Sequence, residues 1–109
     1  MKPLPEKIKV GGRIYDVIVE NNPDMIIDDK TAGFHNPRRL TITVMSPEFV
    51  HPLKQREILL HEIIHAVAHV GAIDISEDAV RGLANILFGV FQNNDISCLS
   101  EKYEREVIS

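Results

Sequence analysis

A chain of 109 residues, 44% hydrophobic and 26% charged, has the composition of one ordinary globular domain, so we expect a single domain over residues 1–109. Its formal net charge of −4 argues against nucleic-acid binding, which needs a basic face that displaces counterions from phosphates. The single cysteine, Cys98, excludes an internal disulfide and any all-cysteine zinc finger. Neither a secretory signal nor an apolar run of about 20 residues is visible, so we expect a cytoplasmic protein with no membrane partner.

The first third of the chain has the pattern of strands and turns. Lys7–Val10 alternates polar and apolar residues, Gly11-Gly12 follows, and Arg13–Glu20 is rich in Ile, Val and Tyr. Two such runs joined by a Gly-Gly pair are typical of a β-hairpin. A second hairpin is predicted from residues 33–35, a turn at 36–39, and a run at 40–44 whose apolar residues recur with period 2.

From residue 52 onward the sequence predicts helices. Pro52–Val70 lacks strand alternation, begins with a proline and is followed by Gly71, and its apolar residues surround it so fully that we expect a central, buried helix. A second helix is predicted from Ser76, as N-cap, to about Gln92. Its inward stripe is expected to comprise Val80, Leu83, Ala84, Leu87, Val90 and Phe91. Leu99, Tyr103 and Val107 suggest a short third helix and a contact surface. The predicted fold is α+β, a small antiparallel sheet of hairpins followed by an αα pair.

The residues that indicate chemistry are His61-Glu62-Ile63-Ile64-His65, an H-E-x-x-H motif on the first predicted helix. Residues four apart lie one above the other on one helix face, so His61 and His65 can share one Zn²⁺. Glu62 points about 100° around the helix, where it can act as general base on a water held by the metal. A random order of the same residues gives this pattern about 2% of the time. The structural alternative is a buried helix whose histidines are satisfied by other partners.

A catalytic zinc site needs a third protein ligand. His69 lies about 12 Å from His61 along a straight helix and cannot share the ion. Asp74, Glu77 and Asp78 are the acidic candidates, and the helical wheel favours Glu77, which borders the apolar stripe of the second helix while Asp78 lies on its polar face. If Glu77 is not a metal ligand, its position at the start of the helix is explained by a favourable interaction with the helix dipole.

The run His61 to Ala66, followed by Glu77, Val80, Leu83 and Ala84, resembles the compact zincin-type metallopeptidases of the ImmA/IrrE-like kind. Short relatives of these are common among bacteriophage and prophage proteins. The resemblance covers roughly residues 40–94 and implies a minimal zincin-like fold, zinc on His61, His65 and Glu77, Glu62 as general base, and a protein substrate, often a regulator. The chain differs from longer members in lacking a helix-turn-helix module and in its shorter gap between His65 and Glu77.

Together these patterns predict a zinc-dependent peptidase that cleaves a protein or peptide. One alternative is a non-catalytic, metal-stabilised binding or regulatory module of phage or prophage origin, in which Cys98, or His69 after a break in the helix, could add a fourth ligand. Another is a metal-dependent hydrolase of a non-protein amide or ester. Tyr15, His35 and Tyr103 are candidates for stabilising an oxyanion, although no spacing places them near the metal.

Overall fold

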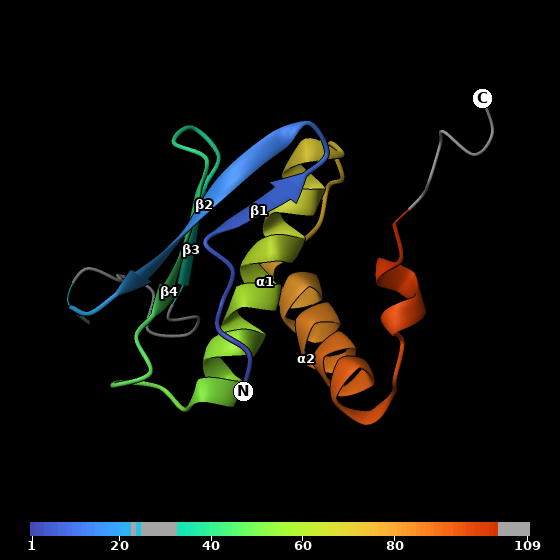
Figure 1. Cartoon of the computed structure of the whole chain (residues 1–109). Coiled ribbons are helices and arrows are strands. Elements are labelled where there is room, and N and C mark those ends of the chain that lie inside the picture. Colours follow the sequence, from blue (N-terminus) through green and yellow to red (C-terminus); the bar gives the residue numbers. More distant parts are fainter. Residues whose placement is uncertain (23, 25–32, 103–109) are drawn as a thin grey trace.

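The computed structural model describes residues 1–22, 24 and 33–102, which form a four-stranded sheet followed by two α-helices (Figure 1). The strands are β1 (Lys7–Val10), β2 (Arg13–Glu20), β3 (Gly33–Asn36) and β4 (Thr41–Met45). Both predicted hairpins are confirmed, since β1 pairs antiparallel with β2 and β3 pairs antiparallel with β4. The α+β class is likewise confirmed.

The two hairpins meet through a parallel pair of strands, so the sheet is mixed where a wholly antiparallel sheet was expected. The strand order is β1-β2-β4-β3, and β2 runs parallel to β4 from the Asp16–Thr41 pair to the Glu20–Met45 pair. This pairing joins strands of different hairpins, and local turn signals carry no information about it. Because β4 lies between β2 and β3, β3 forms one edge of the sheet.

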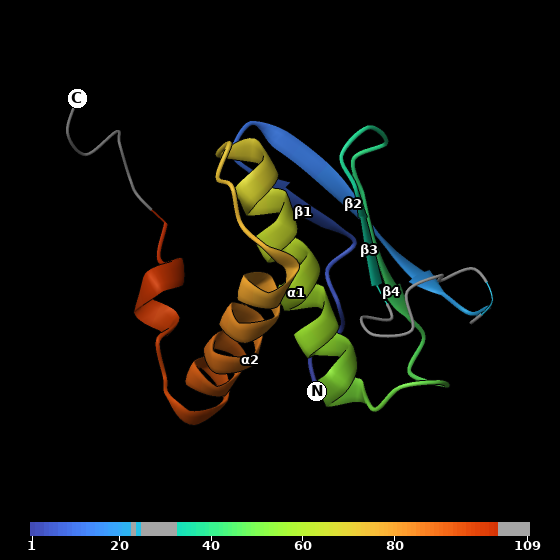
Figure 2. The ribbon, with the colours of Figure 1, turned by 180° about the vertical axis from the view of Figure 1, so that it is seen from behind.

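Helix α1 (Pro52–Val70) has the predicted bounds and lies between the sheet and α2 (Figures 1 and 2). The Nδ1 atom of His51 accepts a hydrogen bond from the amide of Leu53 and so caps the helix start. At the other end, the amides of Ala72 and Ile73 bond to the carbonyls of His69 and Ala68, the pattern of a Schellman motif.

The face of α1 that packs on the sheet carries Ile58, Leu59, Glu62 and Ala66, all of them buried. Ile58, Leu59 and Ala66 join the main core, which also contains Val10, Tyr15, Ile42 and Val44. The helix is central, as predicted, but it is not buried on every side, since Leu53 and Val67 are exposed.

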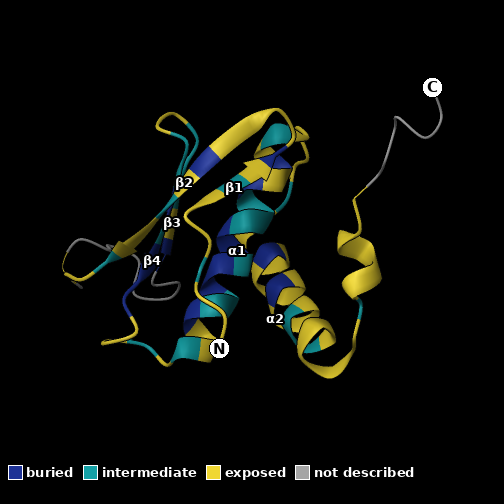
Figure 3. Ribbon diagram, viewed as in Figure 1, coloured by how far each residue is buried: buried dark blue, intermediate teal, exposed yellow. Residues whose placement is uncertain are grey.

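Helix α2 (Glu77–Asn93) packs against α1 through its N-terminal half (Figure 3). Of the predicted inward stripe, Val80 and Ala84 are buried, whereas Leu83, Leu87, Val90 and Phe91 are exposed, so the prediction is wrong for the distal half. The reason is that α2 diverges from α1 toward its C-terminal end (Figures 1 and 2). A 3₁₀ turn, η2 (Ser97–Ser100), follows and contains Leu99 of the predicted short third helix. Tyr103 and Val107 lie outside the described residues.

No helix in the part of the chain that the structure describes is long and apolar enough to cross a membrane.

Candidate metal centre

Two histidines of α1 form the base of the site. His61 and His65 lie on successive turns, and their ring centroids are 5.0 Å apart. His61 is 7% exposed and faces α2, while His65 is more accessible. The four-residue spacing therefore places the two rings side by side, as the motif predicts.

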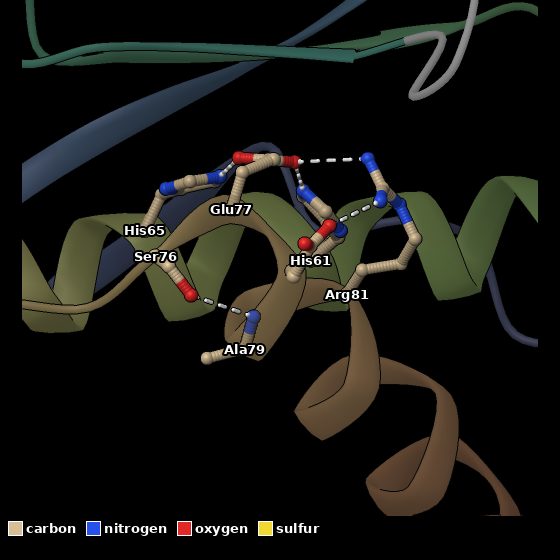
Figure 4. Close-up of polar contacts among 7 residues, drawn as sticks. His61, His65, Ser76, Glu77, Ala79 and Arg81 are labelled. Carbon is tan, nitrogen blue, oxygen red and sulfur yellow. Dashed lines mark hydrogen bonds and ion pairs between the residues drawn. The ribbon is translucent and has the colours of Figure 1, made fainter.

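The carboxylate of Glu77 lies between the two rings (Figure 4). Its Oε1 atom is 2.8 Å from Nε2 of His61, and its Oε2 atom is 2.8 Å from Nε2 of His65. Glu77 is the first residue of α2, and the Ser76 hydroxyl fixes this start by accepting a hydrogen bond from the amide of Ala79. The helix cap thus sets which carboxylate reaches α1.

The three side chains can hold a metal ion by the chemistry and the spacing of their donors. The ligand atoms of His61, His65 and Glu77 all lie within 4.8 Å of one another. Two imidazole nitrogens and one carboxylate oxygen are a donor set typical of catalytic zinc. Neighbouring ligands of tetrahedral zinc lie about 3.3 Å apart when each bond is 2.0–2.1 Å long, slightly farther than the 2.8 Å between the Glu77 oxygens and the two Nε2 atoms.

Burial of the His61 ring sets the electrostatics of this group. Burial lowers the pKa of His61, and the nearby Glu77 carboxylate opposes this effect without reversing it. At neutral pH the ring is therefore uncharged and donates its Nε2–H to the carboxylate. A neutral imidazole is the form that binds a metal ion, so burial favours coordination by removing competition from a proton.

Glu62 lies beside the three candidate ligands at the bottom of a pocket of about 220 Å³. The pocket is open to solvent, and β3 forms its other wall through Gly33, Phe34 and His35. Glu62 is 3% exposed, and a Cβ atom built on Gly33 would lie 3.0 Å from its Oε2 atom and 2.6 Å from Ile58. Glycine at position 33 therefore allows the strand to approach the carboxylate closely.

Adjacent acidic residues on α2 have different environments. The side chain of Asp78 is 94% exposed and pairs with Arg81 at 3.1 Å, away from the histidines. Arg81 also lies 3.8 Å from Oε1 of Glu77 (Figure 4). Asp74 is exposed in the loop between the helices. The geometry thus brings Glu77, and not Asp74 or Asp78, to the two histidines.

The other sequence candidates are placed as follows. Tyr15 is fully buried in the core, and His35 lies in the pocket wall. His69 is exposed and packs edge-on against His35, with ring centroids 5.8 Å apart. Cys98 is exposed on η2 and belongs, like His69, outside the metal-ligand group found among the described residues. Tyr103 lies outside those residues.

Two residues at the site were missed by sequence reasoning. Gly33 starts a strand, and nothing in its local sequence shows that a helix residue lies against it. Arg81 could have been found, because it lies four residues after Glu77 and three after Asp78 on the same helix, where such side chains meet.

Comparisons of the chain with protein-family models, curated proteins and solved structures gave no match. The resemblance to zincin-type metallopeptidases therefore depends on the motif and its geometry alone.

Proposed function

We propose that the chain is a zinc-dependent metallopeptidase, of the compact ImmA/IrrE-like kind, that hydrolyses a peptide bond in a protein or peptide. The observation that carries this proposal is the convergence of His61, His65 and Glu77 beside the buried carboxylate of Glu62 in one open pocket. Hydrolysis needs a general base beside the metal and access for the substrate, and the buried Glu62 in an open pocket can supply both.

In the proposed reaction His61, His65 and Glu77 would hold Zn²⁺. Bound zinc supplies Lewis acidity and lowers the pKa of a coordinated water to about 7. Glu62 takes a proton from the attacking water as its oxygen bonds to the peptide carbonyl carbon. Glu62 then passes that proton to the amide nitrogen, the C–N bond breaks, and an amine and a carboxylate leave.

The position of β3 supports an extended peptide as substrate. This strand is at the edge of the sheet and forms one wall of the pocket through Gly33, Phe34 and His35. An edge strand can pair its backbone with an extended chain, which would lay the substrate across the pocket above Glu62. Phe34 is exposed and is available for a side-chain contact.

The test is to measure zinc binding and peptide hydrolysis for the purified chain and four variants. We expect one zinc per chain in the wild type, and more than about a 100-fold loss of affinity in His65→Ala and Glu77→Gln, because even outer-shell partners contribute about 10–100-fold. Asp78→Asn, which changes the neighbouring carboxylate, should bind normally. Glu62→Gln should retain zinc and lose about 10²–10⁴-fold in hydrolysis of a peptide mixture followed by mass spectrometry.

The second candidate is a metal-stabilised module that binds a partner without catalysis. It is favoured by the exposed apolar residues on the distal half of α2, which are Leu83, Ile86, Leu87, Val90 and Phe91. Stoichiometric zinc with no hydrolysis by the wild type would favour this module. Hydrolysis that persists undiminished in Glu62→Gln, with contaminating protease excluded, would falsify the role of Glu62.

A further inference from the structure

His35 occupies the wall of the pocket that faces the candidate metal centre. It lies on β3, and its neighbours in the pocket include His61, Glu62, His65 and Glu77. The side chain is partly buried, so it contacts both the core and the open space of the pocket. A group in this position would lie beside the reacting carbonyl of a peptide that runs along β3.

The His35 ring contacts the side chain of Tyr15. The Nε2 atom of His35 lies 3.4 Å from the Tyr15 hydroxyl oxygen, a long hydrogen bond, and the two ring centroids are 5.4 Å apart. Tyr15 is 0% exposed, so its hydroxyl needs a partner inside the protein, and His35 is the one it has among the described residues. The phenol can donate its proton to Nε2, which then acts as acceptor.

The direction of the Tyr15–His35 hydrogen bond determines which nitrogen of His35 carries the hydrogen, and we infer that the phenol donates to Nε2. Burial lowers the pKa of His35, and the imidazoles of His69 and His65 lower it further, so the ring is neutral at pH 7. A neutral ring whose Nε2 accepts from Tyr15 carries its hydrogen on Nδ1. With its hydrogen on Nδ1, the ring would offer a donor to a ligand in the pocket that His35 lines.

We propose that His35 is a catalytic residue of the peptidase reaction, whose Nδ1–H, oriented by Tyr15, donates a hydrogen bond to the peptide oxygen as negative charge develops on it. The inference rests on the proposed function and assigns a role to a residue outside the H-E-x-x-H motif. A donor aimed at a developing oxyanion contributes about 10²–10³-fold to kcat.

The first test needs no metal and no substrate. ¹⁵N chemical shifts of the imidazole nitrogens, measured on the metal-free chain at pH 7.5, report which nitrogen is protonated. We expect His35 to be protonated on Nδ1, and Tyr15→Phe, which removes the hydroxyl and keeps the ring, to give a mixture of both tautomers. Protonation on Nε2 in the wild type would overturn the inference, because Nδ1 would then be an acceptor.

The second test separates this role from the proposed function. In the zinc-loaded chain, His35→Gln and His35→Ala should keep zinc stoichiometry, lose about 10²–10³-fold in kcat and change KM little. Calorimetry should show acetohydroxamate binding weakened about fivefold to tenfold in His35→Ala, as expected for one lost hydrogen bond. The matched control is His51→Asn, which removes a surface imidazole and keeps a helix-capping acceptor, and it should match the wild type in both assays.

The outcomes distinguish the two proposals. Equal hydroxamate affinity and kcat in wild type and His35→Ala, with Glu62→Gln inactive, would overturn the role of His35 and leave the peptidase proposal standing. A wild type that binds zinc and hydroxamate but cleaves no peptide would reject the peptidase proposal, and the catalytic role of His35 with it. Loss of zinc in His35→Gln would also overturn the catalytic role of His35, because that result would show that His35 belongs to the metal centre.

Discussion

At the scale of single residues, the site shows how one position along a helix separates two chemically similar side chains. Glu77 and Asp78 are neighbours in the sequence, yet Glu77 bridges two imidazoles and Asp78 is 94% exposed beside Arg81. A step of about 100° per residue around a helix is sufficient to do this. The helical wheel therefore identified the carboxylate that faces α1 without any knowledge of the fold.

His35 gives a prediction for the pH dependence of stability in the metal-free chain. Its pKa is lowered on folding by burial against Tyr15 and by the imidazoles of His69 and His65 on α1. As pH falls below about 6.5, the unfolded chain takes up a proton that the folded chain does not, so the free energy of unfolding decreases. Above that pH both states are neutral at His35, and this contribution to stability is fully present.

Urea unfolding between pH 8 and pH 5, with EDTA present, measures this effect. The decline toward low pH should be shallower in His35→Gln than in the wild type, with the remainder due to groups such as His61, whose pKa is also lowered. His51→Asn serves as the control and should decline as steeply as the wild type. Equal slopes for wild type and His35→Gln would contradict the prediction.

At the scale of elements, local signals fixed the helix ends well. The bounds of α1 and the N-cap of α2 follow from Pro52, Gly71 and Ser76, whose roles depend on neighbours a few residues away. The parallel pairing of β2 with β4 joins residues about 25 positions apart and depends on how the two hairpins pack together, which no local pattern encodes. The close approach of Gly33 to Glu62 depends on the same packing.

One local detail of the α1 end differs from the usual pattern. Gly71 has φ −84°, and the left-handed conformation of the Schellman motif is adopted by Ala72, with φ 52°. A residue with a Cβ atom in this region costs about 1–2 kcal/mol. The glycine thus stands one residue before the position that would benefit from it.

Ala72→Gly should therefore raise the free energy of unfolding by about 1 kcal/mol, because glycine adopts positive φ without strain, although it adds entropy to the unfolded chain. Gly82→Ala is the matched reverse change, in a helix and with no atom within 4 Å of the added Cβ, and it should also stabilise by about 1 kcal/mol. Urea unfolding at constant pH measures both. A lower stability of Ala72→Gly would show that the strain at this turn is negligible.

At the scale of the whole molecule, the candidate metal centre joins two layers that share few buried residues. Val80 and Ala84 are the buried residues of α2, whereas α1 is tied to the sheet by a larger core. An ion on His61, His65 and Glu77 would link α1 to the start of α2. Metal binding is therefore expected to stabilise the position of α2 in particular.

Zinc should raise the thermal unfolding temperature of the wild type. At free zinc about 1,000-fold above Kd, mass action adds about 4 kcal/mol, which corresponds to roughly 15–20 °C for a domain of this size. Scanning calorimetry with and without EDTA measures the shift. Glu77→Gln should show little change on adding zinc, and Asp78→Asn should respond as the wild type does; a wild type whose Tm is insensitive to zinc would argue against the site.

The three candidate ion-binding side chains come from one short stretch, since His61 and Glu77 are 16 positions apart in a helical hairpin, while the opposite wall of the pocket comes from a distant strand. In the proposed enzyme, separate segments would thus hold the ion and select the molecule that binds beside it. Mutations in β3 could alter which molecules are accepted while leaving the affinity for the ion intact. Such a division would let substrate selectivity change during evolution while the metal-dependent reaction is kept.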